Sequence, residues 1–182
     1  MRLQHDTTIT TRAVQARRVP TGEEVEVPAG TEVTITQALG SSFSVVAGGQ
    51  LVRIDGRDAD AIGREIPPPP PTLAGDASPE QVSELIWATL KTCYDPEIPI
   101  DIVDLGLVYA CELTPQEGGR FKVSIDLTLT APGCGMGEVL ANEVAEKVLA
   151  LPPVGQVDVQ LVFDPPWDRY RLSEAARLAL GL

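Results

Sequence analysis

The stretch "RFKVSIDLTLTAPGCGMGEVLANEVAEKV", residues 120–148, decides the fold of this chain. In its first part five apolar residues alternate with polar ones, the pattern of a strand with one buried face. These five residues are Phe121, Val123, Ile125, Leu127 and Leu129. Leu140, Val144 and Val148 then recur at helical spacing, which predicts a helix over about 136–150. A strand therefore passes through a short glycine-rich turn into a helix.

Another helix is predicted before this strand. Ser78 can cap it, Pro79 suits its first position, and Gln81 completes a capping box. Its buried face follows helical spacing and comprises Val82, Leu85, Ile86, Thr89 and Leu90. The helix is predicted to end near Thr92, because two prolines follow closely in "DPEIP".

Two further strands complete the C-terminal part. One is predicted over 105–113 and joins the strand at 121–129 through the hairpin loop "TPQEGGR". The other is predicted over 154–163. Its alternating apolar residues are Val157, Val159, Leu161 and Phe163. The order α-β-β-α-β predicts a three-stranded mixed sheet with a right-handed crossover and helices packed against it. In the tail, Ser173 is predicted to begin a short helix.

Five consecutive prolines, Pro67 to Pro71, mark a boundary, because such a run favours an extended spacer. Before it, short segments rich in β-branched residues are separated by turn signals. These segments are 24–27, 31–37, 43–46 and 50–54. The predicted fold class is therefore α+β. A small antiparallel β module over 1–66 is joined by a Pro-rich linker over 67–77 to the α-β-β-α-β domain and its helical tail over 78–182.

The composition excludes several classes of function. A net charge of -12 argues against nucleic-acid binding, because phosphates attract Lys and Arg. No run approaches the roughly 20 apolar residues of a membrane span, and the start lacks a signal-peptide pattern, so a cytoplasmic protein is expected. Three cysteines without CxxC spacing argue against a disulfide framework or a self-contained zinc site. The loop "DGRDAD", residues 55–60, lacks the order of a calcium-binding EF-hand and is interpreted as a solvated turn.

Cys134 stands in the glycine-rich turn, with Gly133 and Gly135 on either side. The first N–H groups of a helix are unpaired and carry the positive end of the helix dipole. A cysteine there tends to have a lowered pKa and more thiolate, the form that attacks electrophiles and binds metals. The alternative interpretation of Cys134 is a small residue in a tight turn.

Several chemistries of a reactive thiolate are disfavoured. A cysteine hydrolase needs a general base, yet the one histidine, His5, lies in an unpatterned N-terminal arm. A thioredoxin-type enzyme needs CxxC, and "GCGMGEV" matches no phosphate-binding motif. A non-enzymatic thiolate that binds a soft metal remains. The cargo expected is iron or a transient iron–sulfur cluster, for which thiolates are the usual ligands.

An acidic loop precedes the first strand of the C-terminal part. "DPEIPIDIVDLGLVY", residues 95–109, contains Asp95, Glu97, Asp101 and Asp104. In the α-β-β-α-β order, this loop and the turn with Cys134 are expected to open at the same end of the sheet. The carboxylates would then lie near Cys134 as hard ligands or proton acceptors. The alternative is an acidic loop that serves solubility alone.

Three motifs resemble a known family: "YDPEIPIDIVDLGLVY", "LTLTAPGCGMGEVL" and "VFDPPWDRYRLSEAARLALG". In this order, behind a β-rich N-terminal part, they are similar to SufT-type iron–sulfur assembly proteins, whose C-terminal half belongs to the MIP18-like family. The resemblance implies a non-catalytic maturation factor in which Cys134 is the functional cysteine. It also implies that the acidic motif, Asp95 to Pro99, is functional. Cys93 and Cys111 fall outside the signatures, and Cys111 is expected to be buried in its strand.

The combined interpretation is an iron–sulfur assembly factor that helps transfer iron or a cluster to apo-proteins. The candidate ligands are Cys134, Asp95 and Glu97, with Gly133 and Gly135 beside the cargo. Partners implied are the SUF cluster-assembly machinery and apo iron–sulfur client proteins. A homo-oligomer is expected, because one cysteine per chain cannot hold a cluster alone. The alternatives are an adaptor with a structural Cys134 that docks partners through its "DPPW" tail or the linker and, less favoured, a thiol-dependent enzyme.

Overall fold

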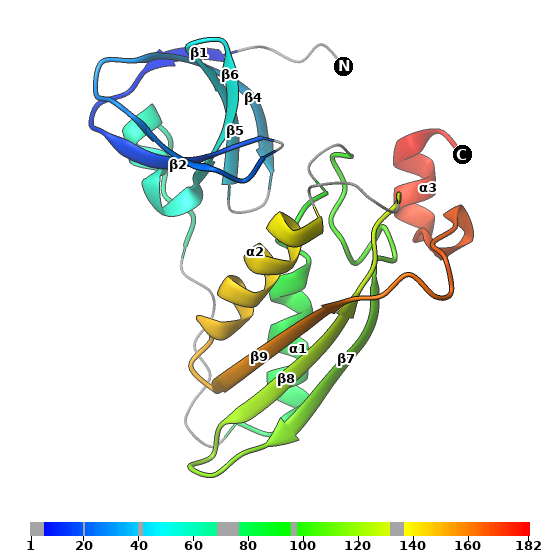
Figure 1. Cartoon of the computed structure of the whole chain (residues 1–182). Coiled ribbons are helices and arrows are strands. Elements are labelled where there is room, and N and C mark those ends of the chain that lie inside the picture. The colour runs from blue at the N-terminus through cyan, green and yellow to red at the C-terminus, as the bar shows by residue number, and fades with distance from the viewer. Residues whose placement is uncertain (1–5, 20, 40–41, 69–76, 96–97, 132–136) are drawn as a thin grey trace. The chain divides into compact units, whose positions relative to one another are not determined.

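The computed structural model divides the chain into two compact units, Met1–Pro69 and Pro70–Leu182 (Figure 1). The predicted linker at 67–77 falls mostly on residues outside the described ranges. The structure describes residues 6–19, 21–39, 42–68, 77–95, 98–131 and 137–182.

The N-terminal unit is a curved antiparallel sheet of six strands in the order β1-β4-β5-β6-β2-β3 (Figure 1). The strands are β1 (Asp6–Ile9), β2 (Val14–Arg18), β3 (Glu24–Val27), β4 (Glu32–Leu39), β5 (Ser42–Ala47) and β6 (Gln50–Asp55). The sequence predicted the last four. It missed β1 and β2, in which polar residues dominate. In β2 only Val14 and Ala16 are buried, while Arg17 and Arg18 are half-buried.

The prediction of a solvated turn at 55–60 is wrong. These residues lead into a 3-10 helix, η1 (Gly56–Ile62), which buries Ala59, Ala61 and Ile62. Arg12 forms ion pairs with two aspartates of this helix: its Nη2 lies 2.8 Å from Asp58 Oδ1 and 2.7 Å from Asp60 Oδ1. Asp58 and Asp60 therefore form ion pairs with Arg12, which lies between β1 and β2. The apolar residues between and after these two aspartates are buried.

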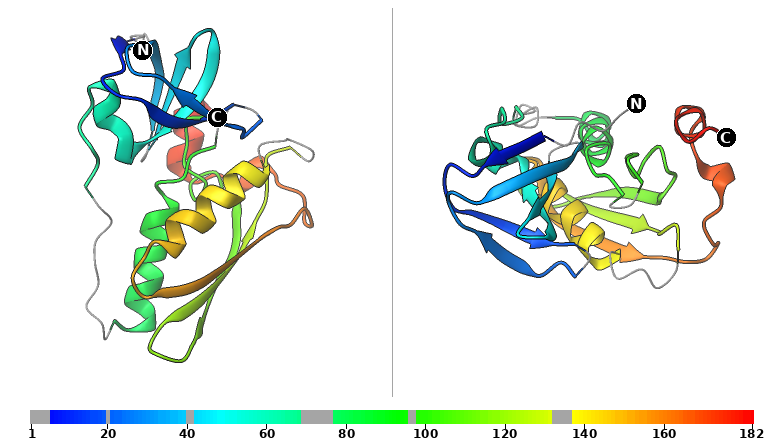
Figure 2. Two further views of the ribbon diagram at one scale, coloured as in Figure 1. Left: turned by 60° about the vertical axis from the view of Figure 1, so that its left-hand side comes forward. Right: turned by 90° about the horizontal axis from the view of Figure 1, so that it is seen from above.

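The C-terminal unit has the predicted α-β-β-α-β order and mixed sheet, which confirms the fold class (Figure 1). β7 pairs antiparallel with β8, and β8 pairs parallel with β9. The two long helices cover one face of this sheet (Figure 2). The elements are α1 (Pro79–Leu90), β7 (Val108–Pro115), β8 (Phe121–Leu127), α2 (Gly137–Leu149), β9 (Val154–Leu161), η2 (Arg169–Arg171) and α3 (Glu174–Leu180).

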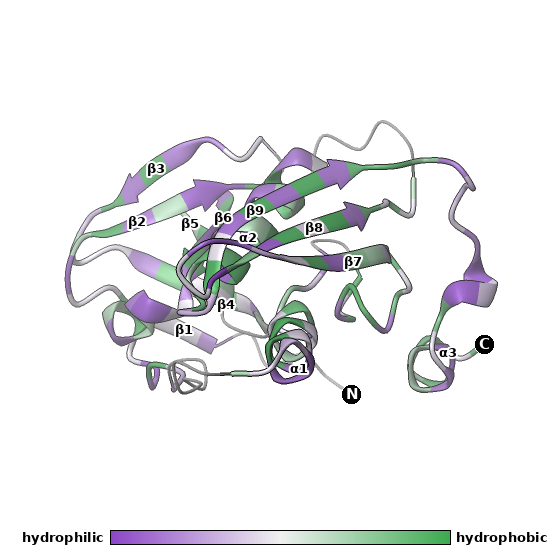
Figure 3. Cartoon of the chain, turned by 90° about the horizontal axis from the view of Figure 1, so that it is seen from below, coloured by the Kyte–Doolittle hydropathy of each residue, from purple (hydrophilic) through white to green (hydrophobic). Residues whose placement is uncertain are grey.

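Local sequence signals account for the helix starts and the buried faces. Ser78 Oγ accepts the Gln81 N–H at 3.3 Å, and Gln81 Oε1 accepts the Ser78 N–H at 3.0 Å, which confirms the capping box. Ser173 caps α3 in the predicted way. Burial alternates along β8 as predicted, and Figure 3 shows apolar and polar residues alternating along β8 and β9. The predicted inward residues of α1 and α2 are all buried.

Two predicted strand limits are wrong. The strand placed at 105–113 begins at Val108, because the preceding residues turn: the Leu105 N–H donates to Asp101 O, and Gly106 has φ +67. The last strand ends at Leu161, and Phe163 is 43% exposed beyond it. In both cases apolar residues extend beyond the segment that pairs in the sheet, before β7 and after β9.

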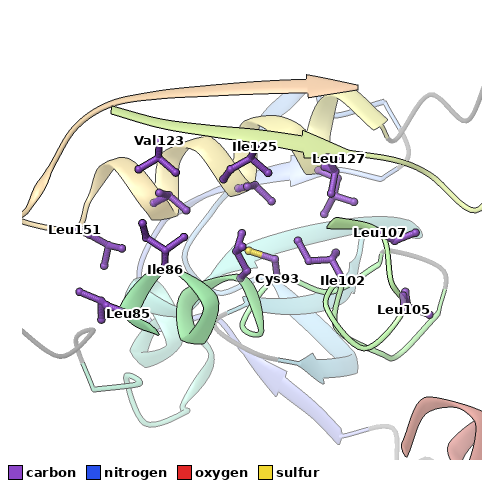
Figure 4. Packing of buried hydrophobic residues seen from close by; sticks show 14 of the residues in the cluster. Leu85, Ile86, Cys93, Ile102, Leu105, Leu107, Val123, Ile125, Leu127 and Leu151 are labelled. Atoms are coloured by element: carbon purple, nitrogen blue, oxygen red, sulfur yellow. The ribbon is translucent and has the colours of Figure 1, made fainter. Parts of the chain in front are cut away.

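The core of the C-terminal unit lies between its sheet and its two long helices. Figure 4 shows Cys93 among these apolar side chains, near Ile86, Ile102 and Ile125. No helix within the described ranges is long and apolar enough to span a membrane.

Candidate functional site

The candidate site lies at the end of the C-terminal sheet where β7 begins and β8 and β9 end. The Thr128 N–H donates to Leu107 O at 2.8 Å, and the Val162 N–H donates to Leu127 O at 2.8 Å. Leu107 closes the acidic loop, and Thr128 begins the connection from β8 to α2. The acidic loop and the connection that contains Cys134 therefore start from the same end of the sheet, as the sequence predicted.

Cys134, Gly133 and Gly135 lie in 132–136, outside the described residues, so their roles stay predictions. Both ends of this segment are described. α2 begins at Gly137, close to the predicted start, and Gly137 is buried. A Cβ at Gly137 would lie 2.6 Å from Leu129 Cδ1 and 3.3 Å from Leu161 Cδ1. The first turn of α2 thus packs against Leu129, just after β8, and Leu161 at the end of β9, and a side chain at position 137 would displace Leu129.

The acidic loop uses two of its carboxylates to fix its own backbone. Asp95 is 7% exposed, and its Oδ1 accepts the Ile98 N–H at 2.9 Å. Asp101 is 9% exposed, and its Oδ1 accepts the N–H groups of Val103 at 3.0 Å and Asp104 at 2.9 Å. Burial raises the pKa of the Asp101 carboxyl, and the neighbouring charge of Asp104 adds to the rise. Glu97 lies outside the described residues.

The other two cysteines are poor candidates for the functional thiol. Cys93 is fully buried in the core. Cys111 lies in β7 and is half-buried rather than buried as predicted; its burial raises the pKa of the thiol to about 11. Across the described ranges, no group of three or more His, Cys, Asp or Glu side chains is placed to hold a metal ion. A site with three such ligands from this chain would draw on residues outside those ranges.

The tail after β9 folds back onto the acidic loop, a feature the sequence did not predict. Trp167 Nε1 donates to Leu105 O at 2.8 Å, and the Ser173 N–H donates to Asp104 O at 2.9 Å. The Arg171 guanidinium lies 4.1 Å from the ring centroid of Tyr109. We call residues 162–173 the C-terminal strap. Trp167 is partly buried and packs within its own unit, while Pro165 and Pro166 of the same tail are exposed.

Comparisons with known proteins identify the family of the C-terminal unit. Residues 83–159 match the model of a family described as "Iron-sulfur cluster assembly protein". Over 103 residues the chain is 38% identical to the Fe-S protein maturation auxiliary factor YitW of Bacillus subtilis, covering 57% of this chain and 97% of that protein. The chain belongs to the iron–sulfur cluster assembly protein family. The resemblance to SufT-type proteins is thereby confirmed.

Two further similar proteins are one with a related name and one with a solved structure. The Fe-S protein maturation auxiliary factor SufT of Staphylococcus aureus is 39% identical over 88 residues, covering 48% of this chain and 96% of that protein. A domain of unknown function, DUF59, from Bacillus anthracis has a solved structure with 37% identity and a TM-score of 0.49, covering 57% of this chain and 94% of that one. The named relatives are called auxiliary factors rather than enzymes. The N-terminal unit lies outside the segment that matches the family model.

Proposed function

We propose that this protein is a maturation factor for iron–sulfur proteins, which passes iron or a cluster to apo-proteins. The main support for this proposal is that the chain matches nearly the whole length of relatives named Fe-S protein maturation auxiliary factors. The residues that match the family model, 83–159, lie in the C-terminal unit. The expected partners are therefore the SUF cluster-assembly machinery and apo iron–sulfur client proteins. In this role the iron or cluster is cargo, held for a time and then released.

The cargo is held by the Cys134 thiolate in this proposal. A thiolate is the ligand that iron–sulfur clusters usually take, and a cysteine near a helix start favours that form. Gly133 and Gly135 leave room for cargo beside it, because glycine has no side chain. Asp95 and Glu97 are the hard ligands or proton acceptors proposed from the acidic loop. Asp95 Oδ1 already accepts the Ile98 N–H at 2.9 Å.

One thiolate leaves the coordination of a cluster incomplete, because clusters are commonly held by four cysteines. The remaining ligands would come from a second copy of the chain, from a small thiol such as glutathione, or from the client itself. Incomplete coordination favours release, which suits a transfer factor. It is also the reason to expect a homo-oligomer.

A transfer assay tests this function. The protein is loaded anaerobically with iron and sulfide, separated from free iron, and mixed with an apo iron–sulfur dehydratase. Wild type is expected to restore client activity, while Cys134→Ser is expected to restore none. Cys111→Ser is the control and should transfer like wild type, since its thiol is half-buried with a raised pKa. Equal transfer by Cys134→Ser would refute the proposed role of this thiolate.

An adaptor remains the second candidate, because apolar side chains of the tail are exposed. Tyr170 is 78% exposed and Leu178 is 73% exposed. Such residues could dock a partner without any cargo on Cys134. An adaptor predicts the opposite pattern in cells: Cys134→Ser would support client maturation as well as wild type, and Leu178→Ser would not.

A further inference from the structure

The last part of the tail carries an exposed cluster of basic and apolar side chains. Arg169 and Arg171 flank Tyr170 in η2, and Arg177 and Leu178 follow in α3. All five are exposed, Tyr170 to 78% and Leu178 to 73%. Arg177 Nη2 donates to Tyr170 O at 2.7 Å, which joins the two elements. We call these five residues the tail patch. Figure 1 shows η2 and α3 beyond the end of the C-terminal sheet.

The arginines of the tail patch lack a carboxylate partner, although the chain has 26 acidic residues. No ion pair joins Arg169, Arg171 or Arg177 to any residue of the described ranges, and this includes the neighbouring acids Asp168 and Glu174. In the N-terminal unit, by contrast, five arginines form ion pairs: Arg12, Arg17, Arg18, Arg57 and Arg64. The positive charges of the tail patch are therefore available to a carboxylate from outside the chain.

The fold accounts for two of these arginines in part and does not account for the third. The Arg171 guanidinium lies over the Tyr109 ring, and Arg177 donates to a backbone carbonyl of the strap. The Arg169 side chain makes no hydrogen bond, ion pair or ring contact with a described residue. Arginine and tyrosine are enriched where proteins bind one another, and the guanidinium fork matches the geometry of a carboxylate. These residue types indicate a binding surface for a protein.

The charge of the whole chain restricts what this surface binds. The net charge is -12. A membrane of anionic lipids, a nucleic acid or a second copy of the chain presents an extended negative surface, which brings it within about 10 Å of the protein's own carboxylates, where repulsion is only partly screened. A short acidic segment contacts the arginines alone. Tyr170 and Leu178 add apolar area, so such a segment gains further from an apolar side chain of its own.

We propose that the tail patch is a docking site for a short acidic protein segment that carries apolar side chains. The three arginines bind its carboxylates, and Tyr170 and Leu178 contact its apolar residues. The proposal involves neither Cys134 nor the cargo, so it is independent of the proposed function.

A peptide-binding assay with the full chain, free of iron, tests the docking site. The probe is a fluorescein-labelled synthetic octapeptide of glutamate pairs alternating with leucine, and its fluorescence anisotropy measures affinity. Arg169→Glu is expected to weaken binding about tenfold, because a repulsion replaces an attraction. Its Tm should equal that of wild type, since no described contact of this side chain is lost. Leu178→Ser should weaken binding about fivefold through lost apolar contact.

The matched control is Arg120→Glu, which makes the same change of charge in the exposed hairpin loop at the other end of the sheet. It should bind the peptide within about twofold of wild type, because a distant exposed charge is screened. Equal affinity of wild type and Arg169→Glu would overturn the docking site, and so would an equal loss in Arg120→Glu. A lowered Tm in Arg169→Glu would assign this arginine to the fold and would also overturn it.

Two further measurements separate other occupants of the tail patch. Vesicles of phosphatidylserine and phosphatidylcholine should not bind wild type, and sedimentation equilibrium should give the same mass for wild type and Arg169→Glu. Vesicle binding that Arg169→Glu abolishes would assign the patch to a membrane. A dimer that this variant separates would assign it to a second copy of the chain. Either result overturns the proposal, while iron transfer through Cys134 is judged by its own assay.

Discussion

Replacing Gly106 with alanine tests how firmly the C-terminal strap holds the acidic loop. Gly106 has φ +67, a left-handed conformation that costs about 1–2 kcal/mol for a residue with a Cβ. The alanine Cβ would also lie 2.4 Å from Arg171 O and 2.8 Å from Arg171 Cβ. Since the nearest atom belongs to the backbone, no rotamer change relieves the clash. The strap itself must move.

The cost follows from the contacts that such a movement breaks. The strap is tied to the loop by Trp167 Nε1 to Leu105 O at 2.8 Å and by the Ser173 N–H to Asp104 O at 2.9 Å. Each hydrogen bond contributes about 1 kcal/mol net. With the conformational cost, Gly106→Ala should lower the free energy of unfolding of the C-terminal unit by about 3–4 kcal/mol.

Urea unfolding followed by tryptophan fluorescence measures this loss, because both tryptophans, Trp87 and Trp167, belong to the C-terminal unit. Gly119→Ala is the matched control. Gly119 has φ +74, but nothing lies within 4 Å of its added Cβ. Only the conformational cost of about 1–2 kcal/mol is expected there. If the two variants lose the same stability, the strap does not hold the loop as described.

Three further substitutions have defined outcomes. Lys147→Met removes the hydrogen bond from Nζ to Thr92 O at 2.9 Å at the end of α1, and should lower the free energy of unfolding by about 1–2 kcal/mol in the same assay. The Arg12 guanidinium lowers the pKa of Asp60 below the ordinary Asp value of 3.8. Their pairing therefore stabilises the folded N-terminal unit at pH values above 3.8, and this stabilisation is lost as the pH falls through the lowered pKa. Arg12→Gln should therefore flatten the acid limb of an unfolding curve measured by circular dichroism. Burial raises the pKa of Asp101, so its ionisation opposes folding as the pH rises above 3.8. Asp101→Asn keeps an oxygen acceptor and should unfold at the same or higher urea concentration at pH 7, whereas a marked loss would show that the charge is needed.

The parts of the fold that sequence predicted are those set by local signals. The capping box at Ser78 and the alternation along β8 involve residues only a few positions apart. Their patterns can therefore be recognised in the sequence without knowledge of the fold. β2 was missed because two of its five residues are arginines, and only pairing with β3 and β6 reveals it as a strand. The acidic residues of η1 resembled a solvated turn, because their partner Arg12 is 46 and 48 positions away.

The candidate site divides in the same way. The order of strands and helices predicted that the acidic loop and the connection after β8 meet at one end of the sheet, and the hydrogen bond between Thr128 and Leu107 agrees with this. The strap could not be predicted, since Trp167 and Leu105 are 62 positions apart and their contact depends on the fold.

The central claim is that the Cys134 thiolate is the group that holds iron. Anaerobic reconstitution with ⁵⁷Fe and sulfide, followed by Mössbauer and absorption spectra of wild type, Cys134→Ser and Cys111→Ser, tests it most directly. The account predicts sulfur-coordinated iron in wild type and Cys111→Ser, and none in Cys134→Ser. Identical spectra for Cys134→Ser and wild type would contradict it.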